Sequence, residues 1–213
     1  MDLKMSMQEL AANLRKPEGE NGLAVAEFMN KGNSNFYNQL VKNVVWRDGM
    51  KVLEIGIGNA KHIPEILQHA TGIEYVGVDY SETMINEAKK NNPNQAFYCE
   101  DVCKLNLKQK FDLIFTINTV YFIDNLELFA EKLKNHLAPK GQILIGKRPK
   151  EDMEKLDSVT KYNFIKYSNE EVVKAVMSSG LDISKVVSSK DPEFDRNGEK
   201  VVLHSDFIIA HGN

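Results

Sequence analysis

The sequence has very little cysteine: only Cys99 and Cys103 occur among its 213 residues. Two cysteines are too few for a disulfide framework or for a zinc site with four cysteine ligands. We therefore expect two reduced thiols and a cytoplasmic protein. The five histidines are scattered along the chain, and no pair has a spacing typical of metal ligands, so we predict no metal site.

Long hydrophobic runs are also missing. The longest, residues 113–123, is interrupted by Thr116, Asn118 and Thr119, and it is too short and too polar to cross a bilayer. The N-terminal residues lack the apolar core and cleavage site of a secretory signal, so we expect neither a signal nor a transmembrane segment. A net charge of −3 gives no support for wholesale nucleic-acid binding, and 42% hydrophobic with 27% charged residues is a globular composition.

Residues 1–45 form an irregular leader in this interpretation, with helical patches at residues 7–14 and 23–29. Proline, glycine and asparagine are frequent there, and no pattern predicts a separate core. Residues 46–213 are expected to form one domain, in which residues 150–167 are a segment suited to cover a substrate.

From residue 50 onward, strands alternate with helices. Apolar runs predict strands at residues 50–55, 73–79, 96–99, 111–118, 141–147, 183–188 and 202–210. Ser81, Asp124 and Ser168 stand at the predicted starts of three helices, where their side chains can cap the first turn. This order predicts an α/β fold: a Rossmann-like, doubly wound sheet of seven mostly parallel strands between two helical layers, with the last strand antiparallel.

Polar residues gather where the predicted strands end, which is where open α/β sheets bind ligands. The first strand runs into a glycine turn in the stretch VLEIGIGNA, and carboxylates follow this and the next two strands. A pyrophosphate fits poorly among such acids. A ribose diol, an exocyclic amine and a net positive charge fit well, and S-adenosylmethionine combines all three.

Five pieces of the sequence, taken in order, resemble the class I S-adenosylmethionine-dependent methyltransferases, of the bacterial type that acts on small molecules. They are VLEIGIGNA, YVGVDYSETMINEA, CEDV, FDLIFTINTVYFI and LAPKGQILIG. The resemblance implies S-adenosyl-L-methionine as the cofactor. It also implies a set of cofactor-binding residues: Glu54, Gly56, Gly58, Asn59, Asp79, Tyr80, Met84, Asp101, Val102 and Asn118.

In that family, the acid before the first glycine helps to organise the methionine end of the cofactor, and here this acid is Glu54. The resemblance further implies that Asp79 binds the ribose hydroxyls and that Asp101 binds the adenine amine. Tyr80 or Met84 would pack near the adenine, Val102 would supply a backbone contact, and Asn118 would face the methionine portion. The chain departs from the family at Ala60, where a third glycine is usual, and alanine narrows the backbone conformations available.

The predicted activity is methyl transfer by in-line displacement to a small, partly apolar acceptor. The leader and residues 150–167 would select this acceptor, and Tyr37, Tyr121 and Tyr162 are candidates for its pocket. No residue stands out as a general base, so the catalytic residues stay unknown. His62 follows the glycine turn closely enough to reach the pocket, but we favour a place on the surface of a helix. The oligomeric state is open.

Two main alternatives stay open, besides aminopropyl transfer on the same fold as a minor third one. One is a nicotinamide-dependent oxidoreductase, because Asp79 follows Gly56 at a distance typical of dinucleotide-binding turns, although Glu54 and Lys61 argue against it. The other is a module that binds S-adenosylmethionine without catalysis and acts through a partner.

Overall fold

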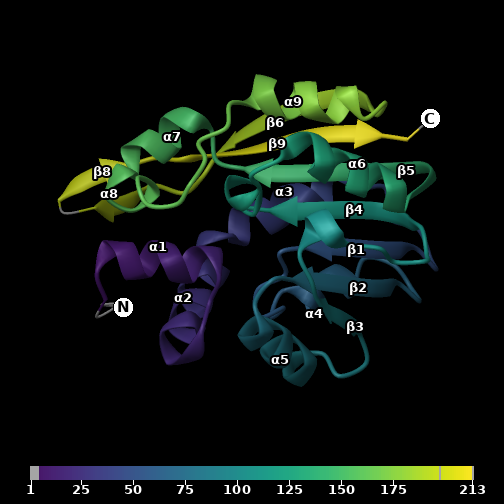
Figure 1. Cartoon of the computed structure of the whole chain (residues 1–213), viewed down its shortest axis with the longest axis horizontal. Coiled ribbons are helices and arrows are strands. Elements are labelled where there is room, and N and C mark those ends of the chain that lie inside the picture. Colours follow the sequence, from purple (N-terminus) through teal and green to yellow (C-terminus); the bar gives the residue numbers. More distant parts are fainter. Residues whose placement is uncertain (1–4, 197, 213) are drawn as a thin grey trace.

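The structure, a computed structural model, describes residues 5–196 and 198–212 and is built around a seven-stranded sheet (Figure 1). The strands lie in the order β3-β2-β1-β4-β5-β9-β6, and in this sheet β9 alone runs antiparallel to its neighbours. Their bounds are β1 (Lys51–Ile55), β2 (Glu74–Asp79), β3 (Ala96–Cys99), β4 (Phe111–Ile117), β5 (Leu137–Lys147), β6 (Asp182–Lys190) and β9 (His204–His211). The predicted α/β fold with an antiparallel last strand is confirmed.

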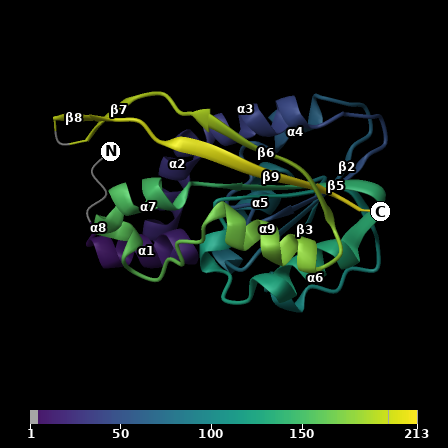
Figure 2. The ribbon, with the colours of Figure 1, turned by 90° about the horizontal axis from the view of Figure 1, so that it is seen from above.

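Apolar side chains cover both faces of the sheet, which explains why β4 reads as a continuous apolar run. Phe111 and Ile114 of β4 belong to one buried cluster, and Leu113 and Phe115 belong to another. Figure 2 shows α6 and α9 on one side of the sheet and α3 and α4 on the other. The helices that follow the sheet strands are α4 (Ile63–Leu67), α5 (Glu82–Asn91), α6 (Leu126–His136) and α9 (Asn169–Ser178).

The leader is more regular than predicted. It forms three helices, α1 (Met7–Arg15), α2 (Gly19–Gly32) and α3 (Ser34–Asn43), so the two predicted helical patches are confirmed within α1 and α2, whereas α3 was not predicted. Ser6 and Glu9 form a capping box at the start of α1 that the sequence interpretation missed. Phe36 and Leu40 of α3 are fully buried against the sheet, which anchors the leader to the main core.

Two of the three predicted helix caps are confirmed. Ser81 accepts a hydrogen bond from the backbone N–H of Met84, and Ser168 forms a capping box with Glu171. The prediction for Asp124 is wrong, because α6 begins one residue later than expected. Asn125 has the extended backbone of a cap residue, and its side chain accepts from the N–H of Leu128 at 2.9 Å.

The segment between β6 and β9 adds a short hairpin to the predicted antiparallel pair. Strands β7 (Phe194–Arg196) and β8 (Glu199–Val201) pair with each other and form a second, two-stranded sheet. Asn197, part of the predicted turn, lies outside the described residues. Together with α1, α2, α7 (Lys150–Lys155) and α8 (Asp157–Thr160), this hairpin lies beyond one end of the sheet (Figure 1). No helix in the described ranges is long and apolar enough to cross a membrane.

The turn after β1 needs a left-handed backbone at Gly56 and Gly58, where φ is +77° and +56°. Ala60 adopts the same region at φ +57°, although its side chain is fully buried. An alanine held there costs about 1 kcal/mol or more in backbone energy. At Gly56 a side chain is excluded outright, because an added Cβ would lie 2.0 Å from Oγ1 of Thr119.

The substitution Gly56→Ala should therefore lower the free energy of unfolding by more than about 3 kcal/mol, since it combines a strained backbone with a clash in a packed site. Gly49→Ala is the matched control, because Gly49 has φ +72° but an added Cβ meets nothing within 4 Å. It should cost about 1–2 kcal/mol. Urea denaturation measures both values, and equal losses would contradict the steric argument.

Candidate functional site

A cavity of about 1390 Å³ lies at the carboxyl ends of β1, β2 and β4, and the loop after β3 also lines it. The strand ends form one side of its wall, and the opposite side comes from α1, α2, α7, α8 and the region of the hairpin. Pockets for one small ligand usually measure about 300–1,000 Å³. The cavity therefore has room for two molecules side by side.

Most of the predicted site residues lie in the cavity wall. Those found there are Tyr37, Gly56, Gly58, Asn59, Asp79, Tyr80, Met84, Asp101, Val102, Asn118 and Tyr121. Glu54 and Tyr162 are not wall residues. Of the two aromatic residues expected in the covering segment, Phe164 lines the cavity and Tyr162 does not, and the ring centre of Phe164 lies 5.9 Å from that of Tyr121.

Asp79 joins the turn after β1 to the start of α5. Its Oδ2 accepts from the N–H of Gly58 and its Oδ1 from the N–H of Ser81, both at 2.9 Å. Although part of the side chain borders the cavity, its enclosure by protein raises the pKa of Asp79 to about 6, and these two hydrogen bonds oppose the shift. Each carboxylate oxygen keeps a lone pair for a further donor.

The wall continues through Asp101, which caps the short 3₁₀ helix η1 (Val102–Lys104) by accepting from the N–H of Cys103 at 2.9 Å. The leader closes this end, because the hydroxyl of Ser81 donates to the carbonyl of Pro17. The ammonium of Lys16 also lies 5.2 Å from the ring centre of the exposed Tyr80. Leader and strand ends thus enclose one compartment.

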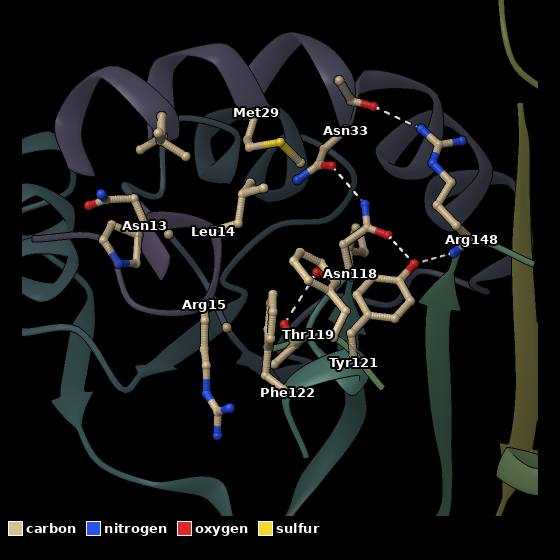
Figure 3. Close-up of a pocket in the computed structure, with 18 of the residues that line it drawn as sticks. Asn13, Leu14, Arg15, Met29, Asn33, Asn118, Thr119, Tyr121, Phe122 and Arg148 are labelled. Carbon is tan, nitrogen blue, oxygen red and sulfur yellow. Dashed lines mark hydrogen bonds between the residues drawn. The ribbon is translucent and has the colours of Figure 1, made fainter. Parts of the chain in front are cut away.

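Asn118 stands between the two halves of the cavity with a left-handed backbone at φ +55°. Its amide donates to Oδ1 of Asn33 at 2.8 Å and accepts from the hydroxyl of Tyr121 at 2.9 Å (Figure 3). The same hydroxyl accepts from the backbone N–H of Arg148. Burial raises the pKa of Tyr121 far above its usual range, so this phenol stays neutral.

Glu54 lies behind the wall. Its carboxylate is fully buried and accepts from Tyr37 at 3.3 Å, from Nε2 of His62 at 2.7 Å and from the hydroxyl of Tyr75. Burial and the nearby carboxylate raise the pKa values of both tyrosines. The predicted direct contact between Glu54 and a ligand does not follow from this position.

His62 corrects a second expectation. It is not on an exposed helix surface: its side chain is 9% exposed and lines the cavity. The ring of Tyr37 stacks on the imidazole with ring centres 4.1 Å apart. The helical pattern around His62 gives no sign of this, because the partners lie far away in the sequence.

Beyond Asn118 the wall is mainly apolar. The side chains come from the leader, the 3₁₀ helix η2 (Val120–Phe122), residues 150–167 and the hairpin region. They are Leu10, Leu14, Phe28, Met29, Phe122, Ile123, Met153, Leu156, Val159, Phe164, Phe194 and Leu203, which we call the apolar chamber. The contribution of Phe194 and Leu203 was not predicted.

Arg148, which follows β5, ties the walls of this chamber together. Its guanidinium donates to Asp191, to the carbonyl of His204 at 2.9 Å and to the carbonyl of Gly32 at 3.3 Å. Asn35 of α3 donates to the other oxygen of Asp191 at 2.6 Å. Leader, sheet and hairpin region therefore meet at one nearly buried ion pair.

Asp191→Ala should lower the free energy of unfolding by about 3 kcal/mol or more, because it leaves the Arg148 guanidinium buried without its counter-charge. Glu193→Ala is the matched control, since Glu193 pairs with Lys200 on the exposed hairpin. It should cost less than about 1 kcal/mol. Urea denaturation of both variants decides the point: similar losses would show that the Arg148 pair does not hold the walls.

Asp79 should make stability fall as the pH rises. The folded state binds its proton more tightly than the unfolded state, so the stabilisation is complete below about pH 4 and is lost as the pH passes the folded pKa of about 6. Between about pH 4.5 and pH 7.5, wild type should lose about 2 kcal/mol relative to Asp79→Asn. Urea denaturation across this range measures the difference, and a constant difference would refute the shift.

Comparison with known proteins gives a consistent picture. A methyltransferase domain model matches residues 53–145. Malonyl-[acyl-carrier protein] O-methyltransferases from Bacillus anthracis and Bacillus cytotoxicus are 28% and 31% identical over 109 and 112 residues, covering 50% and 51% of this chain. A pavine N-methyltransferase from Thalictrum flavum subsp. glaucum is 26% identical over 46% of the chain and 29% of its own length. The match spans only 40% and 39% of the two Bacillus proteins.

Solved structures extend the similarity of fold to nearly the whole chain. A chain in complex with a methyltransferase activator from Haloferax volcanii superposes with a TM-score of 0.77 at 14% identity, over 94% of this chain and 97% of that one. The N-methyltransferase NodS from Bradyrhizobium japonicum, in complex with S-adenosyl-L-homocysteine, has a TM-score of 0.67 at 12% identity, over 97% and 98%. The matched domain, the sheet order and the acids at the strand ends agree: residues 53–145 match a methyltransferase domain, and the chain has the fold of the methyltransferase structures.

Proposed function

We propose that the protein transfers a methyl group from S-adenosyl-L-methionine to a small, partly apolar acceptor. One observation supports this most: a single cavity is lined both by the acidic strand ends and by the apolar chamber, with Asn118 also in its wall. An adenosine ligand and an acceptor can then lie next to each other. Holding two reactants in one orientation is the main contribution a protein makes to a displacement of this kind.

The strand ends suit the cofactor. Asp79 has free lone pairs for the ribose hydroxyls, and Asp101 stands at the next strand end for the adenine amine. Tyr80, Met84 and Val102 would pack against the adenine. The glycines of the turn would let the backbone approach the cofactor, with Asn59 beside them and Asn118 facing the methionine portion. When bound, this cofactor supplies an electrophilic methyl group on a sulfonium.

The residues around the apolar chamber would bind and orient the acceptor and exclude water. Asp191 pairs with Arg148, and Asp124, 3.8 Å from Arg15, is largely exposed to solvent. The hydroxyl of Tyr121 is held by Asn118 and Arg148. We therefore expect an acceptor that reacts without a buried general base, such as a carboxylate or an amine that reaches the site in its neutral form.

The leader and residues 150–167 would act as the cover of the acceptor site, with Tyr37 and Tyr121 facing into the cavity. The named relatives act on different acceptors: one group methylates oxygen on malonyl-[acyl-carrier protein], and another methylates nitrogen of pavine. A panel for this chain should therefore contain both carboxylates and amines with apolar bodies. A cytoplasmic location remains a prediction from the low cysteine content.

Isothermal titration with S-adenosylhomocysteine tests the cofactor assignment. Wild type should bind, and Asp79→Ala should weaken binding by about 10-fold or more, because two ribose hydroxyls lose a charged acceptor. Asp182→Ala, at the exposed start of β6, is the matched control and should leave the dissociation constant unchanged.

If Asp79→Ala binds S-adenosylhomocysteine as tightly as wild type, Asp79 does not bind the ribose. If wild type does not bind S-adenosylhomocysteine, the cofactor assignment is wrong. A parallel titration with NADH, followed by fluorescence, tests the alternative of a nicotinamide-dependent enzyme. Binding of NADH would favour that alternative over a methyltransferase. Turnover of S-adenosylmethionine with the acceptor panel distinguishes an enzyme from a module that only binds the cofactor.

A further inference from the structure

We propose that His62 binds the carboxylate at the amino-acid end of the cofactor and that Glu54 is the positioning residue that holds His62 in place. This inference rests on the proposed function and concerns the same cavity. It gives Glu54 an indirect role, in agreement with its place behind the wall.

The geometry fixes one side of the imidazole and leaves the other side available. Nε2 of His62 lies 2.7 Å from Oε2 of Glu54, and a carboxylate oxygen can only accept, so this nitrogen carries a proton. Nδ1 has no hydrogen-bond partner among the described residues. Since His62 lines the cavity, Nδ1 is the nitrogen left for a ligand.

With a carboxylate bound in the cavity, both ring nitrogens of His62 would have an acceptor. Glu54 on one side and a ligand carboxylate on the other would each accept a charge-assisted hydrogen bond from the ring. The parallel ring of Tyr37, 4.1 Å away, adds a π face to the cation. Tyr37 also donates to Glu54, so the leader helps to fix both partners.

The position along the sheet matches the amino-acid end of the cofactor. In the proposed function the adenine lies beyond β3 and the ribose beyond β2, so the rest of the molecule extends toward β1 and β4. His62 directly follows the glycine turn of β1 and precedes α4. It therefore stands where a carboxylate at the far end from the adenine would lie.

Other cationic side chains in the wall are engaged or lie elsewhere. Arg148 is paired with Asp191 and donates to backbone carbonyls, and Arg15 lies 3.8 Å from Asp124. Lys31 lies beside Gly32, and the carbonyl of Gly32 accepts a hydrogen bond from Arg148. Lys31 therefore belongs to the part of the cavity that would hold the methyl acceptor. Lys61 pairs with Glu27 of α2 at 2.5 Å and is not a wall residue.

The experiment compares two ligands that differ only at this end. S-adenosylhomocysteine carries the amino-acid group, whereas 5′-methylthioadenosine lacks it. In His62→Gln the side-chain amide can still donate to Glu54 but cannot become a cation. The dissociation constant for S-adenosylhomocysteine should rise about 10- to 100-fold, and that for 5′-methylthioadenosine should change less than about twofold.

His69→Gln is the matched control, because His69 stacks on Trp46 away from the cavity; both dissociation constants should stay unchanged. Thermal unfolding of each variant checks that it is folded. An equal loss of affinity for both ligands in His62→Gln would mean a structural role only, and unchanged affinity for both would overturn the inference while leaving the cofactor assignment intact. If wild type bound neither ligand, the cofactor assignment would fail first, and this inference with it.

Discussion

The carboxylate of Glu54 imposes the constraint on which the rest of the site depends. A fully buried charge is tolerated only with several good donors, and here the donors come from three distant parts of the chain. Tyr75 comes from the neighbouring strand, His62 from the end of the glycine turn and Tyr37 from the leader. Satisfying one carboxylate therefore brings together the sheet, the turn and the cover of the cavity.

A second cluster organises the other half of the cavity in the same way. Arg148 and Asp191 join α3, the end of β5 and the hairpin region, while Asn118 connects α2 to η2 through Asn33 and Tyr121. Within the apolar chamber, the rings of Phe122 and Phe164 pack with centres 4.7 Å apart. The polar pairs around the chamber join the segments that form its walls.

The sequence predicted the features that depend on local patterns. Apolar runs located the sheet strands, glycines located the turn after β1, and Asp79 and Asp101 followed from their places after strands. Two helices of the leader were predicted as patches, but α3 and the capping box of Ser6 and Glu9 were missed because glycine and asparagine are frequent in this segment. The orientations of Glu54 and His62 could not be predicted, because they depend on tyrosines from other elements that no local pattern identifies.

The leader crosses both halves of the cavity: Pro17 contacts Ser81 near the end of β2, and Asn33 contacts Asn118 near the end of β4. Any movement that releases α1 and α2 breaks contacts at both places. In the proposed function, the cofactor and the acceptor would therefore lie beneath one continuous cover, and a substitution at either contact would be felt by both ligands.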